Sequence, residues 1–198
     1  NIYMNNTTTA PAKARYQLVE YNEASAEVKA VYDEAMQALQ LPFVLNWFKC
    51  QGQNAILLRG NWAKLKSTLI EGEVPNVLKQ LIIYNVSNLR GCDYCAKAHG
   101  IFADSMSKII SSDENYRATD LESSLLPNSY KTAIRLVTKA ALYSEELTDE
   151  DFQDLKQEGF TDAEVQELMA QADLVNMLNT IATVSGIKLD NELAEAEF

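Results

Sequence analysis

The sequence predicts an all-α protein. Apolar residues recur every three or four positions along most of the chain, a spacing typical of amphipathic helices. We find no sustained alternation of apolar and polar residues, the pattern expected of half-buried strands. The 198 residues are 47% hydrophobic, which is enough to bury a substantial core. We therefore expect two closely packed helical halves.

Capping and helix-breaking residues separate the expected helices of the first half. Asn22 or Ser25 can cap a first helix, which ends before Pro42 because proline lacks the backbone donor. The apolar cluster 43–48 is too dense in large side chains for a solvated loop, so we expect it to be packed. Further helices are expected over about residues 54–70, 76–90 and 92–106.

The second half begins after residues 111–128, a polar and acidic stretch that is the best candidate for a hinge. A helix carrying Ala133, Ile134, Val137 and Ala140 follows it. Thr148-x-x-Asp151 and Thr161-x-x-Glu164 then have the spacing of helix N-terminal capping boxes.

The two ends of the chain are expected to lie outside the packed domain. Residues 1–19 read as a disordered arm, whose polar start lacks the apolar segment of a signal peptide. Residues 189–198 read as a frayed acidic tail. A single helical domain is therefore expected over residues 20–188.

Charge and cysteine content narrow the classes of partner and compartment. The net charge of −11 argues against nucleic acid or an anionic membrane as the main partner. No apolar run approaches the roughly 20 residues that span a bilayer. Three cysteines do not make a disulfide-stapled secreted domain. A reducing cytoplasm is the expected compartment.

The most specific motif places two cysteines and the only histidine on one helix face. Cys92, Cys95 and His99 fall within an arc of roughly 60° if the segment is helical. The cysteine pair can cycle between dithiol and disulfide, and the imidazole can accept or return a thiol proton. These three side chains can carry out redox chemistry without a cofactor.

The sequence leaves open which sulfur ionises first. The start of a helix presents free N–H groups that lower the pKa of Cys92 and, more weakly, that of Cys95. His99 can pair with Cys95 and favours its ionisation, whereas the charge of Asp93 opposes ionisation of both.

Several plainer interpretations compete with the redox reading. The cysteine pair could be two buried small hydrophobic residues, or two of the ligands of a zinc site that still lacks its fourth. Haem attachment is excluded because Ala96 stands where the histidine must follow. Cys50 reads as a buried, inert thiol, and Trp47 and Trp62 read as core or subunit-interface residues.

The run from Val77 to His99 resembles the core of the AhpD-like alkylhydroperoxidases in the carboxymuconolactone decarboxylase superfamily. The signature there is a glutamate, then Cys-x-x-Cys, then a histidine. Residues 41–46 resemble an earlier loop of the family, and residues 147–186 resemble its peroxidase-related branch. The similarity covers about residues 20–188.

This resemblance implies an AhpD-like helical fold and thiol-dependent reduction of an organic hydroperoxide, with no cofactor or metal. It implies that Cys95 attacks the peroxide, Cys92 resolves the sulfenic acid and His99 is the proton-relay base. It also implies an external dithiol reductant, such as a thioredoxin-like or lipoyl protein. A trimer or hexamer is implied too, and the bulky 43–48 cluster and the tryptophans favour such a homo-oligomer.

Two positions depart from the family pattern. The relay glutamate falls on Gln80, which can orient a proton carrier but cannot act as a base. The histidine that some members carry just before the second cysteine is Tyr94. Lactone decarboxylases of the superfamily are disfavoured because they generally lack the cysteine pair. A redox-responsive or zinc-holding helical interaction module, without turnover, is the alternative.

Overall fold

The structure is a computed structural model that describes residues 14–196. Over this range the chain forms ten α-helices and no strand, so the all-α prediction is confirmed. The helices are α1 (Ala26–Leu39), α2 (Asn46–Lys49), α3 (Ala55–Leu65), α4 (Asn76–Arg90), α5 (Asp93–Ser105), α6 (Ser107–Ile110), α7 (Asn128–Leu142), α8 (Asp149–Gln157), α9 (Asp162–Ser185) and α10 (Asn191–Ala194). A π-helical turn over Lys66–Ile70 continues α3, so the helix expected over residues 54–70 ends in a wider turn.

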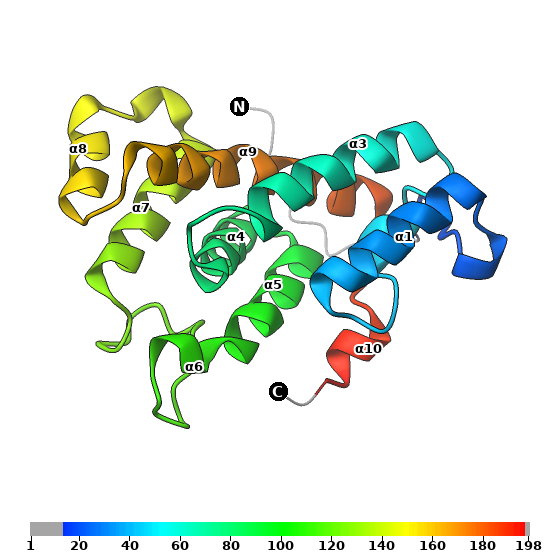
Figure 1. Cartoon of the computed structure of the whole chain (residues 1–198), viewed down its shortest axis with the longest axis horizontal. Helices are drawn as coiled ribbons and strands as arrows, with labels where there is room; N and C mark the ends of the chain where they lie inside the picture. The colour runs from blue at the N-terminus through cyan, green and yellow to red at the C-terminus, as the bar shows by residue number, and fades with distance from the viewer. Residues whose placement is uncertain (1–13, 197–198) are drawn as a thin grey trace, which may run out of the picture.

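Helix α4 lies in the middle of the molecule, with α5, α7 and α9 packed around it (Figure 1). Apolar side chains leave it in several directions, and Leu78, Leu81, Ile82 and Val86 are each fully buried. A helix that is apolar over most of its circumference is stable only when other helices cover it. The core therefore surrounds α4, the helix that also carries Gln80.

The predicted helix starts are confirmed at three positions. The Ser25 hydroxyl accepts a hydrogen bond from the backbone of Val28, which selects Ser25 over Asn22 as the cap of α1. Thr148 and Thr161 both form complete capping boxes, at α8 and α9. The end of α1 comes slightly earlier than expected, because Gln40 adopts a left-handed conformation before the proline is reached.

The cluster over residues 43–48 is packed, as predicted. Trp47 and Phe48 lie in α2 and are buried, and Phe48 makes edge-to-face contacts with Trp47 and Trp62. Both tryptophans are buried within a single chain, so they belong to the core and give no reason for a subunit interface. The homo-oligomer stays a prediction that rests on the resemblance.

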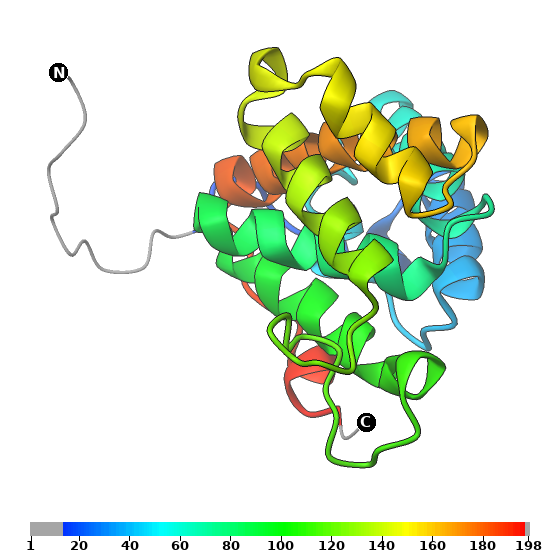
Figure 2. The ribbon, with the colours of Figure 1, turned by 90° about the vertical axis from the view of Figure 1, so that its left-hand side faces the viewer.

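The C-terminal segment is part of the packed molecule, contrary to the expected tail over residues 189–198. Asp190 and Leu193 are each only 2% exposed, and α10 lies beside α5 (Figures 1 and 2). The apolar Leu193 and the hydrogen bonds of Asp190 hold this segment in place. The packed region also begins before residue 20, because the backbone N–H of Arg15 donates to the Ser185 carbonyl. Residues 1–13 of the predicted arm lie outside the described range.

The predicted hinge segment, residues 111–127, connects α6 to α7 as a series of turns. The backbone N–H of Ala118 donates to the Ser107 hydroxyl, and that of Thr119 donates to the Asp104 carboxylate. These bonds fasten the segment to α5 and α6. Among the described residues, none of the helices combines the length and apolar character that crossing a bilayer requires.

Candidate redox site

The two cysteines lie at the sharp junction between α4 and α5. Gly91 ends α4 in a left-handed conformation with φ of 69°, which glycine adopts without strain. Cys92 follows as the residue that caps α5, just before its first turn rather than within it. Cys95 and His99 then lie in the first and second turns of α5, and all three residues are buried.

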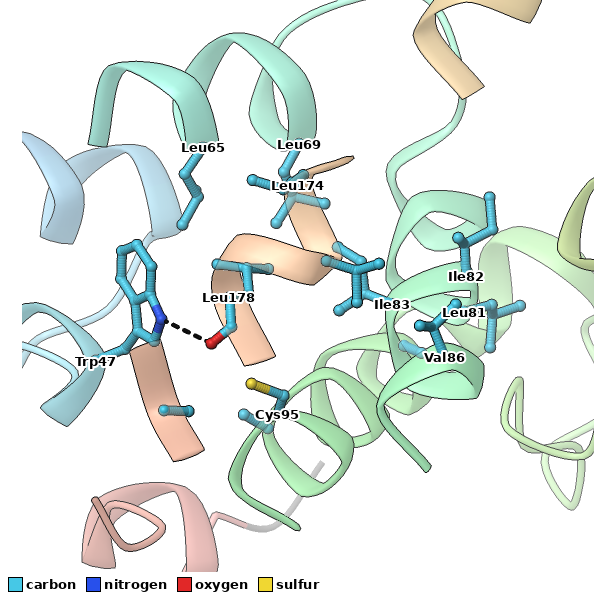
Figure 3. Close-up of a cluster of buried hydrophobic side chains, with 14 of the residues drawn as sticks. Trp47, Leu65, Leu69, Leu81, Ile82, Ile83, Val86, Cys95, Leu174 and Leu178 are labelled. Atoms are coloured by element: carbon cyan, nitrogen blue, oxygen red, sulfur yellow. Dashed lines mark hydrogen bonds between the residues drawn. The ribbon is translucent and has the colours of Figure 1, made fainter. Parts of the chain in front are cut away.

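Cys95 lines a narrow, partly open cavity of about 30 Å³, which has room for one water-sized group. We call it the Cys95 cavity. Figure 3 shows the Cys95 sulfur facing a ring of large apolar side chains that includes Trp47 and Leu178. The cavity is lined by Leu39, Leu45, Trp47, Phe48, Leu65, Leu69, Gln80, Tyr94, Cys95, Ala98, His99, Phe102 and Leu178. Its walls are therefore apolar, and a few polar groups converge beside the sulfur.

His99 and Gln80 are in direct contact at the cavity wall. The distance from His99 Nδ1 to Gln80 Oε1 is 2.6 Å, and Gln80 Nε2 donates to Asn76 Oδ1 at 3.2 Å. The bond to Asn76 points the amide oxygen of Gln80 at the imidazole. An amide oxygen can only accept, so Nδ1 carries the ring proton and Nε2 is left as a free acceptor.

Burial lowers the pKa of His99 to about 4. The imidazole is therefore neutral at pH 7, with no positive charge to offer a thiolate. A glutamate at position 80 would favour the charged imidazolium, whereas the uncharged Gln80 does not. His99 is thus prepared to accept a proton through Nε2.

The ionisation of each sulfur depends on the other. The Cys95 thiol donates a hydrogen bond to Cys92 and, against the cost of burial, lowers the pKa of Cys92 to about 6. The same hydrogen bond, together with burial, raises the pKa of Cys95. These opposite shifts favour ionisation of Cys92 before that of Cys95. The histidine was expected to favour ionisation of Cys95, and the neutral His99 supplies no positive charge for this.

The two sulfurs also differ in what they face. Cys95 lines the Cys95 cavity and Cys92 does not. A molecule that enters the cavity would meet Cys95 first, with Cys92 as the second sulfur directly behind it. Both are free thiols in this structure.

Helix α9 contributes polar groups that the sequence analysis did not identify as part of the site. Asn179 Nδ2 donates to Ser87 Oγ at 2.9 Å, while its Oδ1 is buried with no partner. A hydrogen bond from Asn179 lowers the pKa of Cys95, against the larger effects that raise it. Thr183, one turn further along α9, does the same for Cys92. One helix therefore supplies a polar side chain to each sulfur.

Asp190 is a further residue beside the site, and the sequence did not reveal it. The Tyr94 hydroxyl donates to Asp190 Oδ2 at 2.8 Å, and the backbone N–H of Asn46 donates to Oδ1 at 2.6 Å. The backbone N–H of Trp47 donates to the Tyr94 hydroxyl at 3.3 Å. Burial raises the pKa of Asp190, against these hydrogen bonds, which lower it. No local pattern singles out Asp190, because its partners lie far away in the sequence.

Within residues 14–196, no group of three or more His, Cys, Asp or Glu side chains is arranged to hold a metal ion. His99 is directed to Gln80, and the two cysteines are directed to each other. The zinc-holding alternative therefore finds no set of ligands among these residues.

The arrangement of these helices is the AhpD-like helical fold. The structure superposes on an alkylhydroperoxidase AhpD-core, peroxidase-related protein from Ralstonia eutropha JMP134, with a TM-score of 0.79 and 20% identity over 93% of this chain and 96% of that one. A peroxidase-related protein from Silicibacter sp. TM1040 matches with a TM-score of 0.77 and 18% identity, over 96% and 98% of the two chains.

The debrominase Bmp8, solved in complex with 2,3,4-tribromopyrrole, has the same fold, with a TM-score of 0.71 and 18% identity over 92% of this chain and 96% of that one. No protein-family model and no curated protein matches the sequence. Likeness at these identities establishes the AhpD-like fold that the sequence predicted. The chemistry must be argued from the site.

Proposed function

We propose that this protein is a thiol-dependent oxidoreductase of the AhpD-like type, which reduces hydroperoxides through Cys95 and Cys92. The observation that carries the proposal is that Cys95, His99 and Gln80 line one apolar cavity, with the second thiol of the Cys-x-x-Cys pair next to Cys95 in the chain. Apolar walls favour an uncharged alkyl hydroperoxide over a charged substrate. The dithiol form needs a reducing compartment, which favours the cytoplasm.

The first step joins Cys95 to the terminal oxygen of the hydroperoxide. The Cys95 proton passes along the existing hydrogen bond to the Cys92 thiolate, and the new Cys95 thiolate attacks as the O–O bond breaks. His99 Nε2 accepts the hydroperoxide proton and returns it to the departing alkoxide, which leaves as the alcohol. The products are a Cys95 sulfenate, a Cys92 thiol and an alcohol.

The second step forms the disulfide. The Cys92 proton moves to the sulfenate oxygen, and the Cys92 thiolate attacks the Cys95 sulfur. The S–O bond breaks, and the departing hydroxide takes a proton from solvent to become water. An external dithiol, from a thioredoxin-like or lipoyl protein, then reduces the disulfide through a mixed disulfide and is itself oxidised.

Gln80 has a positioning role in this scheme. Its amide oxygen holds the Nδ1–H tautomer of His99 and thereby keeps Nε2 available as the acceptor. It cannot take a proton itself, so the relay is shorter than one that includes a glutamate.

The test is stopped-flow measurement of thiol loss after addition of an organic hydroperoxide, with mass spectrometry of the product. We expect a Cys92–Cys95 disulfide, no reaction in Cys95→Ser, and an unchanged rate in the control Cys50→Ser. Sustained turnover with added dithiol separates an enzyme from a redox-responsive module, which would be oxidised only once. An active Cys95→Ser variant, or a disulfide that includes Cys50, would contradict the proposal.

A parallel measurement with 2,3,4-tribromopyrrole addresses the activity suggested by Bmp8. The Cys95 cavity has a volume of about 30 Å³ and is partly open, so the two oxygens of a hydroperoxide can reach Cys95 with the alkyl group held outside, whereas a brominated ring must itself reach the sulfur and cannot enter unless the walls move apart. We expect no bromide release. Release of bromide that depends on Cys95 would replace the hydroperoxide by a halogenated ring as the substrate.

A further inference from the structure

Asp190 connects two segments that lie far apart in the sequence. One carboxylate oxygen accepts from Tyr94, the residue between the two cysteines, and the other accepts from the backbone at Asn46. Asp190 is 2% exposed, so water cannot replace either bond readily. The same carboxylate therefore holds both the Cys-x-x-Cys turn and the start of α2.

The Tyr94 hydroxyl both donates and accepts a hydrogen bond within the protein. It donates to Asp190 and accepts from the backbone N–H of Trp47, whose indole forms part of the cavity wall. A phenol that donates to a buried carboxylate is unsuited to give its proton to a substrate, because a phenolate would then lie beside a negative charge. Tyr94 and Asp190 are thus suited to fixing geometry rather than to moving protons.

We propose that Asp190 is a positioning residue which, through Tyr94, holds the Cys-x-x-Cys turn in its dithiol arrangement and so sets the reduction potential of the Cys92–Cys95 couple. This inference rests on the dithiol–disulfide cycle proposed above. It assigns a redox role to the C-terminal segment, which lies about a hundred residues beyond the cysteines.

The physical reason lies in the change of geometry that oxidation requires. The hydrogen bonds of Tyr94 are present while both cysteines are free thiols. A disulfide needs the sulfurs about 2.05 Å apart, with a defined dihedral angle, and any adjustment of the Cys92–Cys95 turn that accompanies closure displaces Tyr94. A tether on Tyr94 opposes that adjustment, so it stabilises the dithiol relative to the disulfide.

The test is the equilibrium between the protein and a glutathione redox buffer, measured by mass spectrometry of the Cys92–Cys95 peptide. Tyr94→Phe removes only the hydroxyl and keeps the ring. We expect it to raise the equilibrium constant for disulfide formation about tenfold, which makes the potential about 30 mV more negative. The matched control is Tyr32→Phe, which removes a buried hydroxyl bonded at 2.9 Å to the Val19 carbonyl. That control should leave the equilibrium constant unchanged.

A second variant separates the tether from a general loss of stability. Asp190→Asn keeps an oxygen for the Asn46 N–H but weakens the acceptor for Tyr94, so we expect a shift in the same direction. The double variant should shift no further than Tyr94→Phe alone, because both changes break one bond. Equal constants in wild type, Tyr94→Phe and Asp190→Asn would overturn the role of Asp190. Failure of the wild-type disulfide to form would instead overturn the proposed function.

Discussion

Cys50 and Cys92 are similarly buried, with 3% and 4% of their surfaces exposed. Their pKa values nevertheless shift in opposite directions from the ordinary value of a cysteine. Burial raises the pKa of Cys50 to about 11. The hydrogen bond from the Cys95 thiol lowers the pKa of Cys92 to about 6 despite burial. Depth in the core therefore does not decide whether a thiol is reactive. The groups around the sulfur decide it.

The position on a helix reinforces the contrast. Cys50 follows the last residue of α2, and its thiol donates to the Trp47 carbonyl at 3.2 Å. Cys92 precedes the first residue of α5, where backbone N–H groups are free. Cys50 also lines a larger cavity, of about 500 Å³, without an imidazole or a second sulfur among its lining residues. The larger cavity therefore lacks the groups that accompany Cys95, namely an imidazole and a second thiol.

The largest expected effect is on alkylation of the two thiols. At pH 7 most of Cys92 but only about one molecule in 10⁴ of Cys50 is thiolate. Iodoacetamide should therefore modify Cys92 faster, by less than this 10⁴-fold difference in thiolate fraction because a thiolate of lower pKa is a weaker nucleophile. The two side chains are similarly exposed but only Cys50 lines the larger cavity, so reagent access favours Cys50 and faster labelling of Cys92 would reflect its ionisation. Mass spectrometry of the labelled peptides between pH 5 and 9 would measure the rates. Faster labelling of Cys50 would remove the contrast.

The Cys95→Ala variant sharpens this measurement. Removal of the Cys95 thiol removes the donor that lowers the pKa of Cys92, so the midpoint of Cys92 labelling should rise towards the ordinary value. A midpoint that stays near 6 would assign the low pKa to the start of α5 and to Thr183 instead.

Short-range patterns made much of this arrangement predictable. The capping residues and the spacing of Cys92, Cys95 and His99 are local features, and helical periodicity translates them directly into structure. The order in which the two sulfurs ionise was not predictable, because it depends on which thiol donates to the other. The direction of the neutral His99 was not predictable either. Its direction is set by Gln80, on a different helix.

Long-range partners account for what the sequence did not reveal. Asp190 lies 96 positions from Tyr94, and Asn179 lies 92 positions from Ser87. A single acidic residue near the chain end has the composition of a solvated tail. Only the packing of α10 beside α5 makes it a buried acceptor.

The next largest expected effect is on the rate of thiol loss when His99 is removed, because no imidazole lies beside Cys50. His99→Ala should reduce the rate of hydroperoxide-dependent thiol loss by about 10² to 10⁴, the usual contribution of a general acid–base group. The rate of wild type should not fall between pH 7 and 5 on account of His99, whose pKa is about 4. An unchanged rate in His99→Ala would show that proton transfer runs through water or substrate.

Gln80→Glu tests the partner of that imidazole. A carboxylate in place of the amide adds a base to the relay and favours the imidazolium, so the pKa of His99 should rise. We expect faster turnover, with a new acidic limb in the pH profile. NMR titration of the only histidine would measure the pKa directly. A pKa that stays near 4 would mean that burial outweighs the added charge.

The smallest expected effect is on stability at alkaline pH, where Cys50 is the thiol of interest. Its pKa is about 11 in the folded protein against an ordinary value of 9.0, so folding favours the protonated thiol. The protonated Cys50 thiol adds about 2 to 3 kcal/mol to the free energy of unfolding. This contribution is fully present below pH 9 and is lost as the pH rises through 11. The contribution of Cys92 to stability has the opposite pH dependence. Its lowered pKa stabilises the folded protein above pH 9, and that contribution is lost as the pH falls through 6.

Urea unfolding of wild type and Cys50→Ala at pH 8 and pH 10.5 isolates the Cys50 contribution. The Cys50→Ala variant should be less stable at pH 8 by about 1 kcal/mol from lost packing, and it should lose less stability than wild type as the pH rises. Parallel pH dependence in the two proteins would show that Cys50 titrates normally, and burial alone would then not separate the two thiols.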